Sequence, residues 1–241
     1  MRSTQSFAAA FALSVVLTPA SALATREQPA PLAGTVIPHP TPALGFTLTD
    51  QNGSAFRMAD TRGRVVVLTF IYTHCGDTCP FMAVKARDAR TLLGKDADKV
   101  DFVAVTTDPK RDTVPVIAAY SKALGLSDGW HFVTGSTESV RSVWFDYGVG
   151  AEVEKEATPA VRAGQEEAAE TEDADNPKKG LSAEGLALAD RIVREFGGGY
   201  EVAHTAPFWI IDPRGMIRIV LDAAATPEDL VTDIRAMMKG R

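Results

Sequence analysis

Two cysteines, Cys75 and Cys79, are the only ones in the chain and have the spacing C-x-x-x-C. They follow an apolar run over 65–72, rich in β-branched and aromatic residues, which is typical of a central strand buried on both faces. Pro80 suits the first turn of a helix, because its missing N–H would have no intrahelical partner there. We therefore expect both sulfur atoms at the carboxyl end of a buried strand, where open α/β sheets place their chemistry.

This placement predicts thiol reactivity or metal binding. Cys79 would lie at or next to a helix N-terminus, where partial positive charge lowers the pKa of a thiol and favours the thiolate. A thiolate attacks disulfides and binds soft metals such as Cu(I) and zinc, but two cysteines cannot complete a four-sulfur site. A third or fourth ligand must therefore come from elsewhere in the chain.

A structural disulfide is the alternative role for two cysteines in an exported protein. A bridge across so short a loop removes little conformational entropy from the unfolded chain, because the stabilisation grows with loop length. Redox or metal chemistry is therefore the favoured interpretation of Cys75 and Cys79.

The N-terminus has the pattern of a secretory signal peptide. Arg2 precedes an apolar core over 7–17, and the small-x-small ending at 22–24 predicts cleavage after Ala24. The core is short for a bilayer, so an uncleaved membrane anchor is the weaker interpretation. No cysteine directly follows the cleavage site, which argues against a lipoprotein. We expect a soluble periplasmic protein that reaches a membrane only through a partner.

Composition and charge set further limits. The chain has 241 residues, 31 acidic and 25 Lys or Arg side chains and a formal net charge of −6. It carries no basic stripe, so we expect no nucleic acid partner. Residues 25–43 are rich in Pro, Ala and Thr and predict a flexible leader, followed by one large domain over 44–241.

Strand and helix patterns alternate along this domain. An Asn-Gly turn within 46–57 predicts an N-terminal hairpin. The strand over 65–72, a helix to about Leu93 and a strand over 100–106 predict a right-handed βαβ unit. A long strand over 200–212 and its return over 216–221 predict a second hairpin before the last helix. The order predicts an α/β thioredoxin-like fold, with a mixed central sheet flanked by helices.

Residues 150–180 differ from the rest of the domain. They contain nine acidic and four basic side chains and little apolar material to bury. Such a composition predicts a disordered acidic insertion that acts as a solvated spacer. An acidic arm that docks a partner or attracts metal ions is the alternative.

Several motifs resemble those of the Sco/SenC family. They are residues 73–80 (THCGDTCP), residues 107–113 (TDPKRDT), His204 ahead of an apolar strand, and residues 212–215 (DPRG). The resemblance covers roughly residues 45–238, interrupted by the acidic insertion. It implies a thioredoxin-like copper-binding protein that helps to assemble the dinuclear copper site of cytochrome c oxidase.

The resemblance also implies a ligand set. Cys75, Cys79 and His204 would bind copper together, and two thiolates with one imidazole suit both Cu(I) and Cu(II). Asp77, between the cysteines, could adjust the thiol acidity or contact the metal indirectly, or it could cap the helix. The copper would pass to a subunit of a respiratory oxidase or to another periplasmic copper protein.

Two other functions use the same cysteines. A periplasmic thiol–disulfide oxidoreductase would use Cys75 and Cys79 as catalytic residues and would not need His204. A redox or copper sensor would use the same atoms to bias a mobile loop. The sequence also departs from the family at Gly76, where relatives commonly carry proline, and this predicts a more mobile loop. Asp108 and Asp112 are expected to order the loop after their strand, with Arg111 as a partner.

Overall fold

The structure is a computed structural model that describes residues 31–126, 128–153, 176–205 and 207–240. The expected signal peptide and the middle of the acidic insertion lie outside these residues. In the part of the chain that is described, no helix has the length and apolar character needed to cross a membrane.

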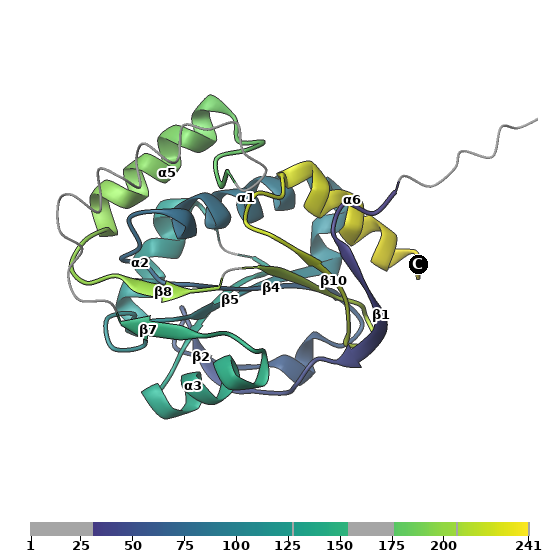
Figure 1. Ribbon diagram of the computed structural model, residues 1–241, viewed down its shortest axis with the longest axis horizontal. Coiled ribbons are helices and arrows are strands. Elements are labelled where there is room, and N and C mark those ends of the chain that lie inside the picture. Colours follow the sequence, from purple (N-terminus) through teal and green to yellow (C-terminus); the bar gives the residue numbers. More distant parts are fainter. Residues whose placement is uncertain (1–30, 127, 154–175, 206, 241) are drawn as a thin grey trace, which may run out of the picture. The chain divides into compact units, whose positions relative to one another are not determined.

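An eight-stranded mixed sheet forms the centre of the fold, in the order β1-β10-β9-β4-β5-β6-β2-β3 (Figure 1). Its strands are β1 (Thr35–Pro42), β2 (Thr47–Asp50), β3 (Ala55–Arg57), β4 (Val65–Ile71), β5 (Val100–Thr106), β6 (Trp130–Thr134), β9 (Phe208–Ile211) and β10 (Met216–Leu221). Strands β4, β5 and β6 run parallel, and the other pairs are antiparallel. The expected mixed sheet, the N-terminal hairpin and the βαβ unit are therefore confirmed.

Helices cover both faces of this sheet (Figure 1). They are α1 (Thr78–Leu93), α2 (Val114–Leu124), α3 (Thr137–Asp146), α5 (Ala183–Phe196) and α6 (Pro227–Met238), with short 3₁₀ helices at Met58–Thr61 and Gly94–Lys99. Helices α1, α2, α5 and α6 share one hydrophobic core, and α3 packs in a second core on the opposite face.

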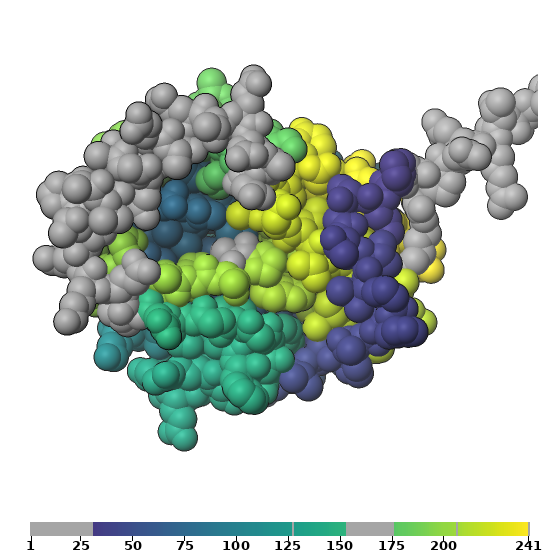
Figure 2. All heavy atoms as spheres, viewed as in Figure 1, coloured from purple at the N-terminus to yellow at the C-terminus, as the bar shows by residue number. Residues whose placement is uncertain are grey.

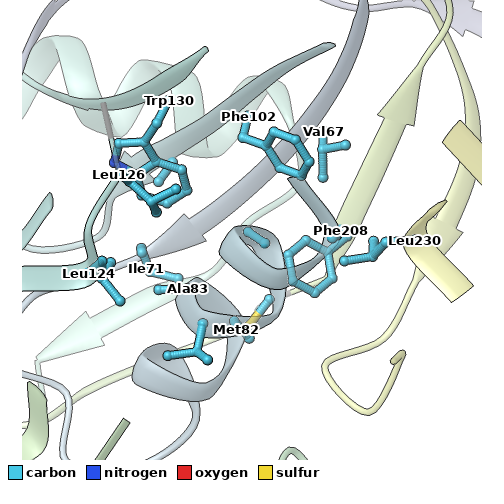
Figure 3. Packing of buried hydrophobic residues seen from close by; sticks show 14 of the residues in the cluster. Val67, Ile71, Met82, Ala83, Phe102, Leu124, Leu126, Trp130, Phe208 and Leu230 are labelled. Carbon is cyan, nitrogen blue, oxygen red and sulfur yellow. The ribbon is translucent and has the colours of Figure 1, made fainter. Parts of the chain in front are cut away.

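Strand β4 is buried on both faces, as its sequence predicts. All seven of its residues are buried, and alternate side chains point to opposite faces of a strand. Val67 therefore packs in the core with α1, near Phe102 and Phe208, while Leu68 packs in the core with α3. Figure 3 shows the first of these cores, with Met82 of α1 and Leu230 of α6 directed into it. The strand and α1 together hold the cysteine loop.

The flexible leader expected over 25–43 is wrong for residues 35–42, which form β1 and pair with β10. The two preceding backbone amides, of Ala33 and Gly34, each donate a 2.9 Å hydrogen bond to the Asp233 carboxylate on α6. The three prolines in β1 lack an N–H, and an edge strand tolerates this because one side of its backbone needs no ladder partner. Composition alone therefore did not predict this ordered strand.

The single long strand expected over 200–212 is also wrong. The chain forms β8 (Val202–His204), which pairs antiparallel with β7 (Ala151–Val153) in a separate two-stranded sheet, the β7–β8 ribbon. Pro207 separates β8 from β9 and cannot donate to a strand ladder. Residues 151–153, at one end of the expected disordered insertion, thus belong to an ordered strand. Figure 2 shows the teal residues of α3 and β7 beside yellow-green residues of the C-terminal third.

Candidate metal centre

The two cysteines lie where β4 passes into α1. Cys75 is in the connecting loop and Cys79 is in the first turn of the helix; both are buried free thiols. Asp77 is the N-cap residue, but within the described residues its side chain makes no capping hydrogen bond and is exposed. Pro80 stands in the first turn, as expected. The arrangement puts both sulfur atoms at the carboxyl end of a central strand.

The structure brings His204 to these thiols. Its ring atom Nε2 lies 3.4 Å from Cys79 Sγ, across a sequence separation of 125 residues. The other ring nitrogen, Nδ1, lies 3.1 Å from the carbonyl oxygen of Thr205. A carbonyl oxygen only accepts, so Nδ1 carries the proton and Nε2 directs its lone pair at the sulfur. Burial lowers the pKa of His204, which keeps the imidazole neutral and able to bind a metal.

The two thiols differ in acidity. Hydrogen bonding with the Cys79 thiol lowers the pKa of Cys75, and the backbone N–H groups of Cys79 and Asp77 act in the same direction. Burial raises the pKa of Cys79 well above its ordinary value. A hydrogen bond to the charged form of a group favours that form, whereas burial disfavours it. Of the two thiols, Cys75 therefore loses its proton first.

The predicted ligands are not all in mutual contact. Cys79 touches His204, and Cys75 interacts with Cys79. Among the residues that the structure describes, no group of three or more His, Cys, Asp or Glu side chains is arranged to hold a metal ion. The ligand set of Cys75, Cys79 and His204 thus stays a prediction, with one of its contacts formed.

The segment before His204 is anchored by Arg111. Its guanidinium donates to the carbonyl oxygens of Gly198 at 3.0 Å and Tyr200 at 2.8 Å, and lies 3.6 Å from the centre of the Tyr200 ring. Asp108 accepts hydrogen bonds from Arg111 and from the Tyr200 hydroxyl. The expected partnership of Asp108 and Arg111 is confirmed. Arg111 also positions the chain that leads to His204.

Asp112 orders the cysteine loop from inside. It is fully buried and accepts hydrogen bonds from the hydroxyls of Thr73, at 2.5 Å, and Thr106, at 2.6 Å. Thr73 also lies 2.8 Å from His74 Nδ1, so the half-buried His74 faces this network. These contacts tie the start of the cysteine loop to the end of β5.

Sequence reasoning missed Tyr72, Tyr200 and Glu201 at this site. The Tyr72 ring meets the His204 ring edge to face, with 5.7 Å between centroids. Tyr200 and Glu201 stand shortly before His204, but nothing in their spacing marks them as partners of the cysteine loop. Only the folded chain brings them together.

Comparison with known proteins decides the family. The sequence model of the SCO1/SenC family matches residues 39–169. The chain belongs to the SCO1/SenC family. A SCO2-like protein of Rickettsia felis is 32% identical over 127 residues, which cover 49% of this chain and 62% of the relative. The match thus spans less than two thirds of that relative's length.

Solved structures of the family share the fold. Bradyrhizobium japonicum ScoI, solved with copper bound, is 25% identical, with a TM-score of 0.58 over 82% of this chain and 99% of ScoI. Apo Sco1 from Thermus thermophilus has a TM-score of 0.61 at 24% identity and covers 86% of this chain and 97% of its own. The expected thioredoxin-like fold is confirmed.

Proposed function

We propose that this SCO1/SenC protein is a copper metallochaperone that binds copper through Cys75, Cys79 and His204. It would deliver the ion to the copper site of a respiratory oxidase or to another periplasmic copper protein. The observation that carries the proposal is the 3.4 Å contact between Cys79 Sγ and His204 Nε2. The other ring nitrogen, Nδ1, is hydrogen-bonded to the carbonyl oxygen of Thr205. The copper-bound ScoI of the same fold supports the choice of metal.

The donor atoms fit copper as cargo. Two soft sulfur atoms and one imidazole nitrogen suit both Cu(I) and Cu(II). Bonds of about 2.0 Å to nitrogen and 2.3 Å to sulfur, typical of a first-row ion, let one ion contact two atoms about 3.4 Å apart. Cys75 offers a thiolate, and Cys79 gives up its proton when the ion binds. The ion would enter and leave by ligand exchange, without a change in its oxidation state.

The test is copper titration of the reduced protein and of two histidine variants. His204→Ala should weaken copper binding and change the spectrum of the Cu(II) form. His39→Ala is the matched control, because His39 is an exposed histidine on edge strand β1, and it should bind like the parent. A His204→Ala protein with the parent's affinity and spectrum would rule out the three-ligand site.

Thiol–disulfide exchange is the second candidate, and the adjacent free thiols of Cys75 and Cys79 favour it. The Cys75 thiolate would attack a target disulfide and release one target thiolate. Cys79 would then attack the mixed disulfide, which frees the second target thiol and leaves a Cys75–Cys79 disulfide. Two electrons pass from the dithiol to the target. Turnover on a protein disulfide that is indifferent to His204→Ala would favour this function.

We also propose that the mature protein begins after Ala24 and acts in the periplasm, where Asp77 adjusts the acidity of the cysteine pair. Asp77 is exposed beside a buried thiol pair, which supports a role through its charge over a direct bond to the metal. The mass of the protein recovered from the periplasmic fraction tests the cleavage site. A mass that retains residues 1–24 would contradict it.

A further inference from the structure

The strand that carries His204 has a second attachment to the cysteine loop. Tyr72 is the residue that follows β4, and only 2% of its surface is exposed. Its hydroxyl lies 2.5 Å from Glu201 Oε2 and 3.1 Å from the backbone nitrogen of Val202. A phenol hydroxyl can donate one hydrogen bond and accept another. It therefore donates to Glu201 and accepts from Val202, the first residue of β8.

The same tyrosine also touches the imidazole. Its ring meets that of His204 edge to face at 5.7 Å, so one side chain contacts Glu201, Val202 and His204. Glu201 in turn lies over the cysteine loop, since its Oε1 would be 3.8 Å from a Cβ at Gly76. Tyr72 and Glu201 thus connect both halves of the candidate centre.

Few other contacts hold the strand: Val202 packs in the main core, and Arg111 anchors the segment that precedes β8. It is three residues long, and in the described part of the chain its only strand partner is β7, which is equally short. An isolated two-stranded ribbon is marginally stable in water. Gly197, Gly198 and Gly199 precede it, and the last two have positive φ angles of 122° and 83°. The position of His204 therefore depends on side-chain contacts from outside the ribbon.

We propose that Tyr72 and Glu201 are positioning residues that hold β8 so that His204 Nε2 faces Cys79. The role of Tyr72 runs through its hydroxyl: loss of that oxygen frees the Val202 amide and removes the partner of Glu201, while the ring contact persists. The copper part of this inference rests on the proposed function. The predicted effect on β8 is independent of the proposed function, because it concerns the copper-free protein.

The first experiment measures amide hydrogen exchange in the reduced, copper-free protein. Tyr72→Phe should speed exchange at Val202 by at least about tenfold, because that amide loses its acceptor. Glu201→Gln keeps an oxygen that can accept from Tyr72 and should stay close to the parent, whereas Glu201→Ala should speed exchange. Unchanged exchange at Val202 in Tyr72→Phe would overturn the proposal.

Tyr147→Phe is the matched control. Tyr147 is another buried tyrosine, in the second hydrophobic core, and its hydroxyl donates a 2.8 Å hydrogen bond to the carbonyl oxygen of Leu44. Its loss should lower global stability without a selective change at Val202. Selective acceleration at Val202 in the control would overturn the assignment to Tyr72.

The second experiment is a double-mutant cycle for copper affinity. Tyr72→Phe should weaken copper binding about tenfold, in the range found for residues that orient metal ligands. In a His204→Ala background it should have no further effect, because Tyr72 acts through His204. An equal loss in both backgrounds would overturn the positioning role. If His204→Ala itself binds like the parent, the ligand proposal fails, and the exchange experiment still decides whether Tyr72 holds β8.

Discussion

The two halves of the candidate centre are built differently. The cysteines stand between a fully buried central strand and a helix whose inner face lies in the main core. His204 is half-buried on a three-residue strand of the small β7–β8 ribbon. One half is held by the core of the domain, and the other by one buried valine, Val202, and by a few hydrogen bonds and ring contacts.

This difference suits the proposed function, in which the protein binds an ion and releases it. Regions with few buried apolar contacts open locally at a lower free energy than core strands do. Under the proposed function, an acceptor would therefore displace His204 while both sulfur atoms stay in place. The following changes test the contrast between the cysteine half and the histidine half, from the largest expected effect to the smallest.

Cys79→Ser should cause the largest loss of copper binding. Serine keeps the size of the side chain but replaces a soft sulfur ligand by a hard oxygen. Because changes to residues that only orient ligands cost about 10–100-fold, we expect a loss of more than about 100-fold. His204→Ala should cost less, since the two thiolates remain. Competition with a chelator measures both, and equal losses would contradict the division into a sulfur anchor and an adjustable histidine.

Lys85 tests how rigidly the cysteine-bearing helix is packed. It is fully buried in α1 and donates a 2.7 Å hydrogen bond to the carbonyl oxygen of Ala223. Burial lowers its pKa from 10.5 to about 8. Below pH 8 the lysine is charged in both the folded and the unfolded state, and the cost of its burial is fully present. Between pH 8 and 10.5 the folded state loses its proton first, so the free energy of unfolding rises with pH.

The expected rise is about 2–3 kcal/mol over that interval. Chemical unfolding at several pH values measures it, with Lys85→Met as the control. Methionine has a similar length and no charge, so its stability should lack this component. Parallel pH profiles for parent and variant would show that water reaches Lys85 in the folded state.

Matched valine truncations compare the two halves directly. Val67 of β4 and Val202 of β8 are both buried, with 1% and 5% of their surfaces exposed. Val67→Ala should destabilise the protein by about 2 kcal/mol, because the surrounding core cannot close around the cavity. Val202→Ala should cost less than about 1 kcal/mol, since the ribbon can relax. Urea unfolding measures the free energy of unfolding of both variants. Equal losses would contradict the contrast between the two halves.

Gly76→Ala should have the smallest effect. The φ angle of Gly76 lies outside the left-handed region, and an added Cβ would meet only an ordinary 3.8 Å contact with Glu201 Oε1. Alanine would therefore restrict the unfolded chain without strain and stabilise the fold by about 0.5 kcal/mol. Thermal unfolding measures this gain, and a clear destabilisation would show that the cysteine loop needs glycine in its folded form.

Local patterns in the sequence were sufficient for one half of the centre. The apolar run of β4, the Asn-Gly turn of the first hairpin and the Thr-Pro start of α6 act over a few residues, so their conformations were predictable. In α6 the structure shows a capping box: the Thr226 hydroxyl accepts from the Asp229 amide at 3.1 Å, and the Asp229 carboxylate accepts from the Thr226 amide at 2.9 Å. The same reasoning put Cys75 and Cys79 between a buried strand and a helix.

The predictions from the sequence were wrong where segments far apart in the chain determine the structure. The Pro-rich leader became β1 because β10 offered it a free edge, and the expected long strand divided because β8 pairs with β7. Neither partner can be identified from local periodicity, since the pairing joins segments far apart in the chain.

The sequence by itself determined the βαβ unit, the position of the thiols and the motifs that mark the SCO1/SenC family. Tertiary structure alone decided that His204 Nε2 meets Cys79 across 125 residues, and that Tyr72, Glu201 and Arg111 hold the chain around it. Helix and turn signals act between neighbours in the sequence, whereas these contacts depend on how the strands are ordered in the sheet.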